Sequence, residues 1–294
     1  MFTFNFNFPK DSLSLDELSN YSPWLEKILS STSSKPIHRK SADSLLREYG
    51  IDKWGTLLKQ LKMTQVPEVS IADSLCLGPD RVSAFFLNNK YYTAQLYDIH
   101  AAYSAFVMQV MAHYSKPNDH IVDLGAGYGS LSLKMSRIPT FSQNTFSLLE
   151  FTQPGVDCIN LLSSRSQTIT NIGLCDLNNL DISAYDLPAG SLFFTSWVLA
   201  CLPSYLSSTI QKIIDLKPKY VIHFEPCFEF YNLAYPLSSF LWRKYTFLND
   251  YNRTILGALT TFEAESKITF DCRVPNIFGC NPLCPISLLV WKPL

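Results

Sequence analysis

Short apolar stretches recur along the chain at the lengths of strands, and helical patterns lie between several of them. Seven segments have the length and the apolar or aromatic content of strands: residues 120–124, 145–150, 166–175, 191–197, 219–226, 267–274 and 285–291. Helical patterns cover residues 101–113 and 130–135, and another ends at residues 212–217. Because strands alternate with helices, we predict an α/β fold with a mostly parallel sheet. The loop between the last two segments contains Gly, Pro and Asn, which predicts a terminal antiparallel hairpin.

Residues 1–89 precede this alternation and favour helices. Serine and acidic residues suited to a first turn, together with apolar spacing, predict three helices: residues 12–18, 21–29 and 41–49. Gly50 is interpreted as the C-terminal stop of the third. Apolar residues recur at helical spacing over residues 52–63, so Trp54 is interpreted as a core residue. We therefore expect an N-terminal helical cap or appendage, residues 1–89, before a second domain, residues 90–294.

Composition narrows the class of protein further. The chain has 294 residues, 47% of them hydrophobic and 17% charged, so it can bury a large core. Its net charge of −1 argues against a broad basic surface, and we expect no nucleic-acid partner. It has no signal-peptide pattern and no apolar run of about 18 residues, so we expect a cytoplasmic protein without a membrane partner. The 8 cysteines form no C-x2-C pair, and no metal site is predicted.

Residues 120–129 carry the most informative pattern, HIVDLGAGYG. An apolar strand leads into three glycines at alternate positions, and a helical pattern follows. Glycine allows a tight turn and close approach of a ligand to the backbone, while a helix N-terminus supplies unpaired N–H donors. A dinucleotide fingerprint would need Gly or Ala where the chain has Ser130. With Asp123 two residues before the first glycine, the D-x-G-x-G-x-G pattern resembles the first motif of class I S-adenosylmethionine (SAM)-dependent methyltransferases.

The resemblance implies a doubly wound, seven-stranded, mostly parallel sheet whose last strand inserts antiparallel. It also implies that SAM binds beyond the carboxyl ends of the strands and leaves as S-adenosylhomocysteine (SAH). Glu150 ends the second strand, where its two carboxylate oxygens can accept hydrogen bonds from both ribose hydroxyls. After the third strand, Asp176 would accept from the adenine amine while Cys175 and Leu177 frame the ring. The alternative for Asp176 is an Asx turn.

Other residues enter the cofactor site by the same resemblance. The backbone of residues 125–129 would cradle SAM, and the segment before the first strand would reach its methionine end through Tyr92, Gln95 or Tyr97. His100 and His113 are interpreted as structural. The cofactor-binding set is the following: Tyr92, Asp123, Gly125, Ala126, Gly127, Tyr128, Gly129, Glu150, Phe151, Cys175, Asp176, Leu177, Ser196 and Trp197.

The activity implied is methyl transfer to an oxygen or nitrogen of a small molecule or peptide. A hydroxyl or amide acceptor needs a base, and His223 and Glu225 share one face of a predicted strand, which makes them the catalytic candidates. The alternatives are a core histidine for His223 and an ion pair with Arg243 or Lys244 for Glu225. In a second reading, Glu225 and Glu229 bind a cationic side chain for peptide N-methylation. In a third, the protein is a SAM-binding scaffold without transfer.

Residues 227–267 form a long connection rich in aromatic residues. By the resemblance this segment is a substrate-cap insertion with an aromatic-lined pocket. Its alternative is a helical insert that packs its aromatic side chains inward.

Overall fold

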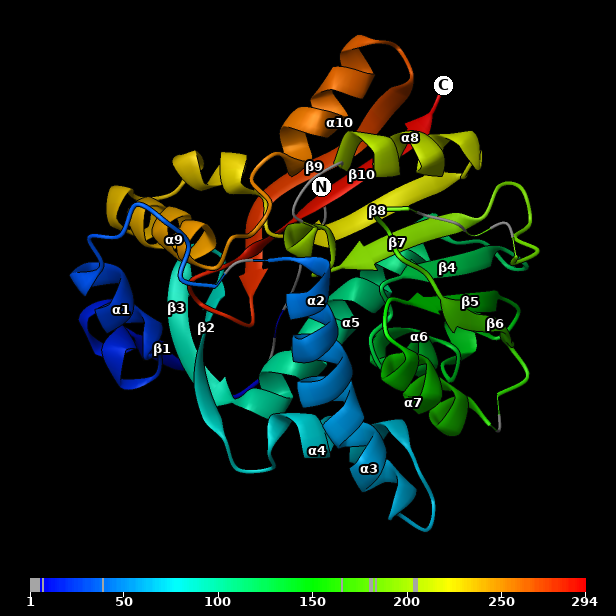
Figure 1. Cartoon of the computed structure of the whole chain (residues 1–294), viewed down its shortest axis with the longest axis horizontal. Coiled ribbons are helices and arrows are strands. Elements are labelled where there is room, and N and C mark those ends of the chain that lie inside the picture. Colours follow the sequence, from blue (N-terminus) through cyan, green and yellow to red (C-terminus); the bar gives the residue numbers. More distant parts are fainter. Residues whose placement is uncertain are drawn as a thin grey trace.

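A computed structural model describes residues 6, 8–38, 40–164, 166–179, 182, 184–202 and 206–294. Within this part of the chain the strands form one ten-stranded sheet in the order β1-β3-β2-β9-β10-β8-β7-β4-β5-β6. Helices cover both of its faces (Figure 1). A hydrophobic core lies on each face of the sheet, and neighbouring residues of β4 point into different cores. Ile121 belongs to the core that includes residues of α5, and Val122 belongs to the core that includes residues of α8 and α10.

The strands have the following bounds: β1 Asp11–Leu13, β2 Val82–Leu87, β3 Lys90–Gln95, β4 His120–Leu124, β5 Thr145–Glu150, β6 Ile169–Leu174, β7 Leu192–Ser196, β8 Tyr220–Glu225, β9 Ile268–Gly279 and β10 Ile286–Pro293. The α-helices have these bounds: α1 Trp24–Ser30, α2 Ala42–Leu45, α3 Thr56–Lys62, α4 Val69–Leu77, α5 Leu96–Tyr114, α6 Ser130–Met135, α7 Gln153–Ser163, α8 Leu206–Asp215, α9 Pro236–Leu248 and α10 Ile255–Ala264. A π-helix, η2, covers Leu46–Gly55, and 3₁₀ turns cover Asp16–Asn20, Pro139–Phe141, Leu199–Cys201 (η4) and Phe228–Leu233.

The α/β prediction and all seven predicted strands are confirmed. β6, β5, β4, β7 and β8 are neighbours and pair in parallel. β10 lies between β8 and β9 and is antiparallel to both, so the expected terminal hairpin is present. These seven strands are part of a larger mixed sheet, and they bring the carboxyl ends of β4 to β8 to one edge.

The sheet is larger than the seven strands expected. β2 and β3 form an antiparallel hairpin that joins the edge of β9, and β1 pairs with β3. Asn88 and Asn89 make the hairpin turn with positive φ angles of 48° and 63°, a two-residue turn that asparagine tolerates. The expected boundary after residue 89 therefore falls inside a hairpin. The helix predicted over residues 12–18 is wrong, because its first residues are held in β1 by pairing with β3.

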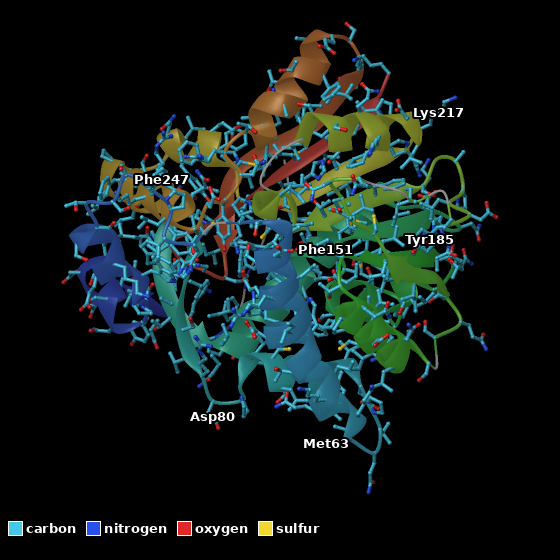
Figure 2. All side chains as sticks on the ribbon, in the orientation of Figure 1. Met63, Asp80, Phe151, Tyr185, Lys217 and Phe247 are labelled. Atoms are coloured by element: carbon cyan, nitrogen blue, oxygen red, sulfur yellow. The ribbon has the colours of Figure 1, made fainter. Side chains whose placement is uncertain are left out.

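Residues 42–62 form one continuous helical rod, made of α2, η2 and α3, which we call the lid helix. It runs across the edge where the parallel strands end (Figure 1), and Met63, labelled in Figure 2, lies just beyond its end. The predicted stop at Gly50 is wrong, since the helix continues through it. Gly50 is buried against α7, where a Cβ would lie 3.6 Å from the side chain of Thr152. A Cβ at this distance would make an ordinary contact, so Gly50 neither ends the helix nor is required by the packing there.

Residues 227–267 fold into a 3₁₀ turn, α9 and α10. Tyr231 and Trp242 are fully buried, and Trp242 packs edge-on against Phe86 of β2. This matches the alternative of a helical insert that packs its aromatic side chains inward. No helix in the described ranges is both long and apolar enough to cross a bilayer.

Candidate functional site

A cavity of about 530 Å³ lies at the carboxyl edge of the parallel strands, beneath the lid helix. We call it the first cavity. Its strand-side wall gathers most of the cofactor-binding set predicted from the sequence: Gly125, Ala126, Gly127, Tyr128, Glu150, Phe151, Cys175, Asp176, Leu177, Ser196 and Trp197. Phe151 lies beside the lid helix near the middle of the view in Figure 2. The role of these residues toward a cofactor stays a prediction.

The glycine loop has little free space around it. Gly125 has a φ of +79°, and a Cβ there would lie 2.5 Å from Cγ2 of Val198. Gly127 has a φ of +61°, and a Cβ there would lie 3.1 Å from the Trp54 ring. Both the backbone conformation and the close approach therefore require glycine. The N–H groups of Gly125 and Ala126 donate to the carbonyl of Leu149 on β5 (2.7 and 3.0 Å), which fixes the loop to the sheet.

Glu150 connects the glycine loop to the next turn. Its Oε2 accepts from the N–H of Gly127 (3.0 Å), and its Oε1 accepts from the N–H and the hydroxyl of Thr152 (3.2 and 3.0 Å). Burial raises the pKa of Glu150, and the hydrogen bonds from Thr152 and Gly127 oppose that shift. Gly155 makes room for the side chain, because a Cβ there would lie 2.6 Å from Cγ of Glu150. The carboxylate thus faces the cavity in a fixed orientation.

The two ends of the first cavity differ in chemistry. At one end, after β6, Asp176 accepts from the N–H of Asn178 through Oδ1 (3.0 Å), which is the Asx turn considered as its alternative. At the other end, after β7, the hydroxyl of Ser196 bonds that of Tyr103 (2.7 Å). Trp197 follows with a φ of 61°, an uncommon conformation for a bulky residue.

Three predicted cofactor residues do not line the first cavity. Asp123 is buried below the loop and accepts from the hydroxyl of Ser132 (2.6 Å), and burial raises its pKa to about 7. Gly129 starts α6 in the left-handed region and is enclosed by apolar side chains. Tyr92 lies on β3, stacked on Phe85.

His223 has both ring nitrogens engaged inside the sheet. Because an indole only donates, Nε2 must accept from Trp291 Nε1 (3.0 Å), and Nδ1–H is left to donate to the hydroxyl of Thr195 (2.9 Å). The side chain is fully buried, and burial lowers the pKa of His223 to about 3. It does not line the first cavity. The placement matches the core-histidine alternative and gives the catalytic prediction no support.

Glu225 and Glu229 are held apart from the first cavity by backbone donors. The carboxylate of Glu225 accepts from the N–H groups of Val198 (2.9 Å) and Ala200 (3.3 Å), so it supports the turn that follows β7. Burial raises the pKa of Glu225 to about 7. Oε1 of Glu229 accepts from the N–H of Gly257 in the first turn of α10 (2.9 Å). Neither residue lines the first cavity, so the paired-glutamate reading finds no support in this geometry.

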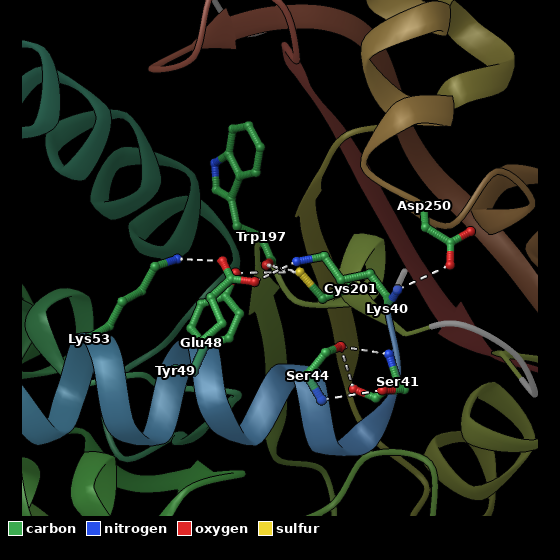
Figure 3. Close-up of polar contacts among 9 residues, drawn as sticks. All are labelled: Lys40, Ser41, Ser44, Glu48, Tyr49, Lys53, Trp197, Cys201 and Asp250. Atoms are coloured by element: carbon green, nitrogen blue, oxygen red, sulfur yellow. Dashed lines mark hydrogen bonds and ion pairs between the residues drawn. The ribbon is translucent and has the colours of Figure 1, made fainter. Parts of the chain in front are cut away.

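The sequence predicted an N-terminal cap or appendage, but not the residues of the lid side of the first cavity. Tyr49, Lys53 and Trp54 line it, and the Tyr49 hydroxyl lies 3.6 Å from Sγ of Cys201 (Figure 3). Trp54 is partly exposed to the cavity, so its interpretation as a core residue is incomplete. His100 of α5 also lines the first cavity, in contrast with its structural interpretation. In the described ranges, no group of three or more His, Cys, Asp or Glu side chains could hold a metal ion.

No family model matches the sequence, and no curated protein matches it. Solved structures that are similar include the CurJ carbon methyltransferase, which is 11% identical, with a TM-score of 0.46 over 86% of this chain and 70% of that one. The neocarzinostatin O-methyltransferase NcsB1, solved with SAH and 1,4-dihydroxy-2-naphthoic acid, is 14% identical, with a TM-score of 0.41 over 66% of this chain and 58% of its own. The mitomycin 7-O-methyltransferase MmcR is 13% identical, with a TM-score of 0.42 over 92% and 75%.

Proposed function

We propose that this protein is a SAM-dependent methyltransferase that acts on an oxygen or nitrogen of a small molecule or peptide. One observation carries the proposal. The glycine loop after β4, Glu150 at the end of β5 and Asp176 after β6 face one cavity at the carboxyl edge of the sheet. Ligands of open α/β sheets bind at this edge. A glycine loop, a ribose-binding carboxylate and an acid near the base are together what an adenosine-bearing ligand requires.

The residues present fit such a ligand. Oε2 of Glu150 accepts a hydrogen bond from the N–H of Gly127, and an ionised carboxylate oxygen can accept a further one from a ribose hydroxyl. Gly125, Ala126 and Gly127 line the cavity, and the space that a Cβ of Gly125 or Gly127 would take is filled by the side chains of Val198 and Trp54. Asp176 would accept from the adenine amine, and Leu177 beside it offers an apolar contact for the ring.

The chain's own task in transfer is orientation and exclusion of water. SAM supplies an activated methyl group on its sulfonium centre. Holding donor and acceptor in line is worth many kcal/mol in general. The lid helix covers part of the first cavity through Leu45, Tyr49 and Trp54. Where a ligand is covered in this way, its polar contacts are strengthened and water is kept from the reacting atoms.

Calorimetric titration with SAM and with SAH tests the binding part of this proposal. We expect both to bind one site per chain, and isotope-labelled SAM to pass its methyl group to an acceptor in a screen of hydroxyl and amine compounds. Failure of SAH to bind at millimolar concentration would remove the proposed function. Binding without transfer across the screen would favour the SAM-binding scaffold.

A further inference from the structure

A second cavity, also of about 530 Å³, lies between the lid helix and helices α4, α5 and α6. Figure 1 shows α3 and α4 side by side below the sheet, and both helices contribute residues to this cavity. Asp52, Gln60 and Leu75 are exposed at its rim, so a ligand can enter it from solvent. Its size is that of an ordinary small-molecule site.

The second cavity adjoins one particular part of the first. The two share a wall made by residues of the lid helix, α5 and the glycine loop with the start of α6: Lys53, Trp54, His100, Tyr103, Tyr128, Ser130 and Leu131. None of these belongs to the ribose and adenine end, where Glu150 and Asp176 lie. If adenosine occupies that end, the sulfonium lies toward the shared wall. A methyl acceptor must come within about 3.5 Å of the methyl carbon, and the second cavity is placed to supply it.

His100 stands on the shared wall with a free side chain. It lies in the first turns of α5 and lines both cavities. Its carbonyl accepts from the hydroxyl of Ser104 (2.8 Å), but within the described residues its ring makes no hydrogen bond. Burial lowers the pKa of His100 to about 4, the Asp73 carboxylate opposes the shift and the Lys134 ammonium adds to it. The ring is therefore neutral near pH 7 and keeps one nitrogen open as an acceptor.

Apart from Asp52 at the exposed rim, the charges that line the second cavity are already compensated. The buried carboxylate of Asp73 accepts from the hydroxyls of Tyr128 (2.7 Å) and Ser130 (2.8 Å) and pairs with Lys134 (2.6 Å). The ammonium of Lys53 at the shared wall pairs with Glu48 (2.9 Å). No charge among these is left for a charged ligand to neutralise, and burying an unpaired charge is costly. The remaining surface is mainly aromatic and aliphatic, including Trp54 and the Tyr128 ring.

We infer that the second cavity binds the methyl acceptor, that this acceptor is an uncharged hydroxyl compound with a flat apolar body, and that His100 accepts its proton. The inference rests on the proposed function and names its substrate class. The acceptor oxygen forms the new O–C bond as the S–C bond of SAM breaks, and sulfur keeps the electron pair of that bond. The hydroxyl becomes much more acidic as the O–C bond forms, so a weakly basic imidazole suffices to take the proton. The products are the methyl ether, SAH and protonated His100.

The test uses the full chain saturated with SAH and umbelliferone, a fluorescent and flat phenol, as the probe. Cys76 lines the second cavity but not the first, and it is exposed, so Cys76→Trp fills the second cavity with Cys76→Ser as its control. His100→Gln keeps a hydrogen-bonding side chain without a basic nitrogen, and His100→Phe keeps neither. His113→Gln, on the same helix and outside both cavities, is the control for these two.

We expect Cys76→Trp, Cys76→Ser and His113→Gln to keep the wild-type affinity for SAH within about threefold, and the His100 variants are compared at saturating SAH. Umbelliferone should bind the wild type, Cys76→Ser and His113→Gln alike, and Cys76→Trp should bind it at least about tenfold more weakly. His100→Gln should keep most of the affinity for umbelliferone and His100→Phe should lose part of it, while both lose methyl transfer to the probe by about 100-fold or more. A role confined to folding would not separate binding from transfer in this way.

Three results would overturn the inference while leaving the proposed function intact. The first is an SAH-saturated wild type that does not bind umbelliferone. The second is Cys76→Trp binding the probe as tightly as the wild type does. The third is transfer by His100→Gln at the wild-type rate. Failure of SAH itself to bind the wild type is a separate result, and it overturns the proposed function together with this inference.

Discussion

The strand-side wall and the lid-side wall of the first cavity are held in place by different forces. On the strand side, backbone hydrogen bonds continue the sheet ladder beyond the strand ends. Cys175 N–H donates to the carbonyl of Glu150 (2.8 Å), and Trp197 N–H donates to that of Phe224 (3.2 Å). The register of the sheet therefore fixes where each residue of this wall lies.

On the lid side the position depends on side chains. Glu48 accepts from Lys40 (2.6 Å) and Lys53 (2.9 Å), and the N–H of Lys40 donates to Asp250 (3.1 Å), as Figure 3 shows. Cys158 of α7 lies with its Sγ 3.6 Å from the Trp54 carbonyl. Side-chain contacts of this kind are individually weak and can be changed one at a time. We infer that the strand wall determines whether the ligand binds, and that the lid wall tunes how tightly.

The glycine loop provides the largest expected effect. Gly125→Ala combines a strained φ of +79° with a Cβ 2.5 Å from Val198, whereas Gly190 has a φ of +77° and no atom within 4 Å. We expect Gly190→Ala to lose about 1 kcal/mol of unfolding free energy for backbone strain alone. Gly125→Ala should lose about 3 kcal/mol because overpacking adds to strain. Urea unfolding measures both, and equal losses would show that Val198 yields easily.

The second prediction concerns the ligand rather than the fold. Glu150→Ala removes the carboxylate that orients the Gly127 N–H and faces the cavity. We expect a loss of SAH affinity of about 30-fold, which corresponds to about 2 kcal/mol for hydrogen bonds to a charged group. Asp157→Asn, on α7 and outside the first cavity, is the control and should leave the affinity unchanged. Wild-type affinity in Glu150→Ala would refute the ribose assignment.

The third prediction uses pH to test the turn behind the strand wall. The pKa of Glu225 rises from 4.5 in the unfolded chain to about 7 in the folded one, because the carboxylate is buried. The folded state then binds more protons between these values, so the contribution of Glu225 to stability is complete below pH 4.5 and declines as pH rises toward 7. The slope is at most about 1.4 kcal/mol per pH unit.

Glu225→Gln should remove this part of the pH dependence in urea unfolding at a series of pH values. The pH dependence that Asp123 contributes to stability should remain in this variant, because the pKa of Asp123 is raised in the same direction. Glu265→Gln changes an exposed carboxylate and should leave the slope as in the wild type. An unchanged slope in Glu225→Gln would mean that this carboxylate is not buried in solution.

Sequence reasoning found the strand wall because its residues are local signals. An acid or a glycine directly after an apolar strand must lie at the carboxyl end of that strand, and parallel neighbours bring these ends together. Glu150, Asp176 and the glycine loop were placed by that argument together with the resemblance to class I methyltransferases. The same argument placed His223 and Glu225 on one face of β8, but it did not show that the face is sealed by β10 and by the turn Leu199–Cys201.

The lid wall was missed because its signals depend on tertiary packing. Helical periodicity shows that Trp54 lies on the apolar face of its helix. It does not show whether that face packs in the core or lines a ligand cavity. A glycine often follows the end of a helix, but here the helix continues through Gly50 to Lys62, and Gly50 is buried within it. In the sequence, His100 is simply a polar residue on an apolar helix. Only the structure shows that it lines both cavities. The pair Asn88-Asn89 between apolar stretches was a readable hairpin signal.

The fourth prediction measures the contribution of the lid wall. The Trp54 ring lies 5.2 Å from that of Tyr128 and packs over Gly127. We expect Trp54→Ala to weaken SAH binding by about tenfold, less than Glu150→Ala, through lost contact and admitted water. Ile51→Ala on the same helix changes a residue that is 69% exposed, and it should have no effect. A loss from Trp54→Ala larger than from Glu150→Ala would reverse the ranking of the two walls.

The smallest expected effect is at the base of the lid helix. Glu48→Gln leaves the ammonium of Lys40 without its partner, and that side chain is only 7% exposed, whereas Lys53 is 45% exposed. Glu48→Gln should therefore cost about 1 kcal/mol of unfolding free energy, and Lys53→Met about 0.3 kcal/mol. Because these ion pairs hold the lid helix, Glu48→Gln should also increase the rate of SAH dissociation, measured by stopped flow, by about twofold. High salt should increase the dissociation rate of the wild type in the same way, because it screens the ion pairs. A dissociation rate that neither the substitution nor salt alters would show that the lid is held by its apolar contacts alone.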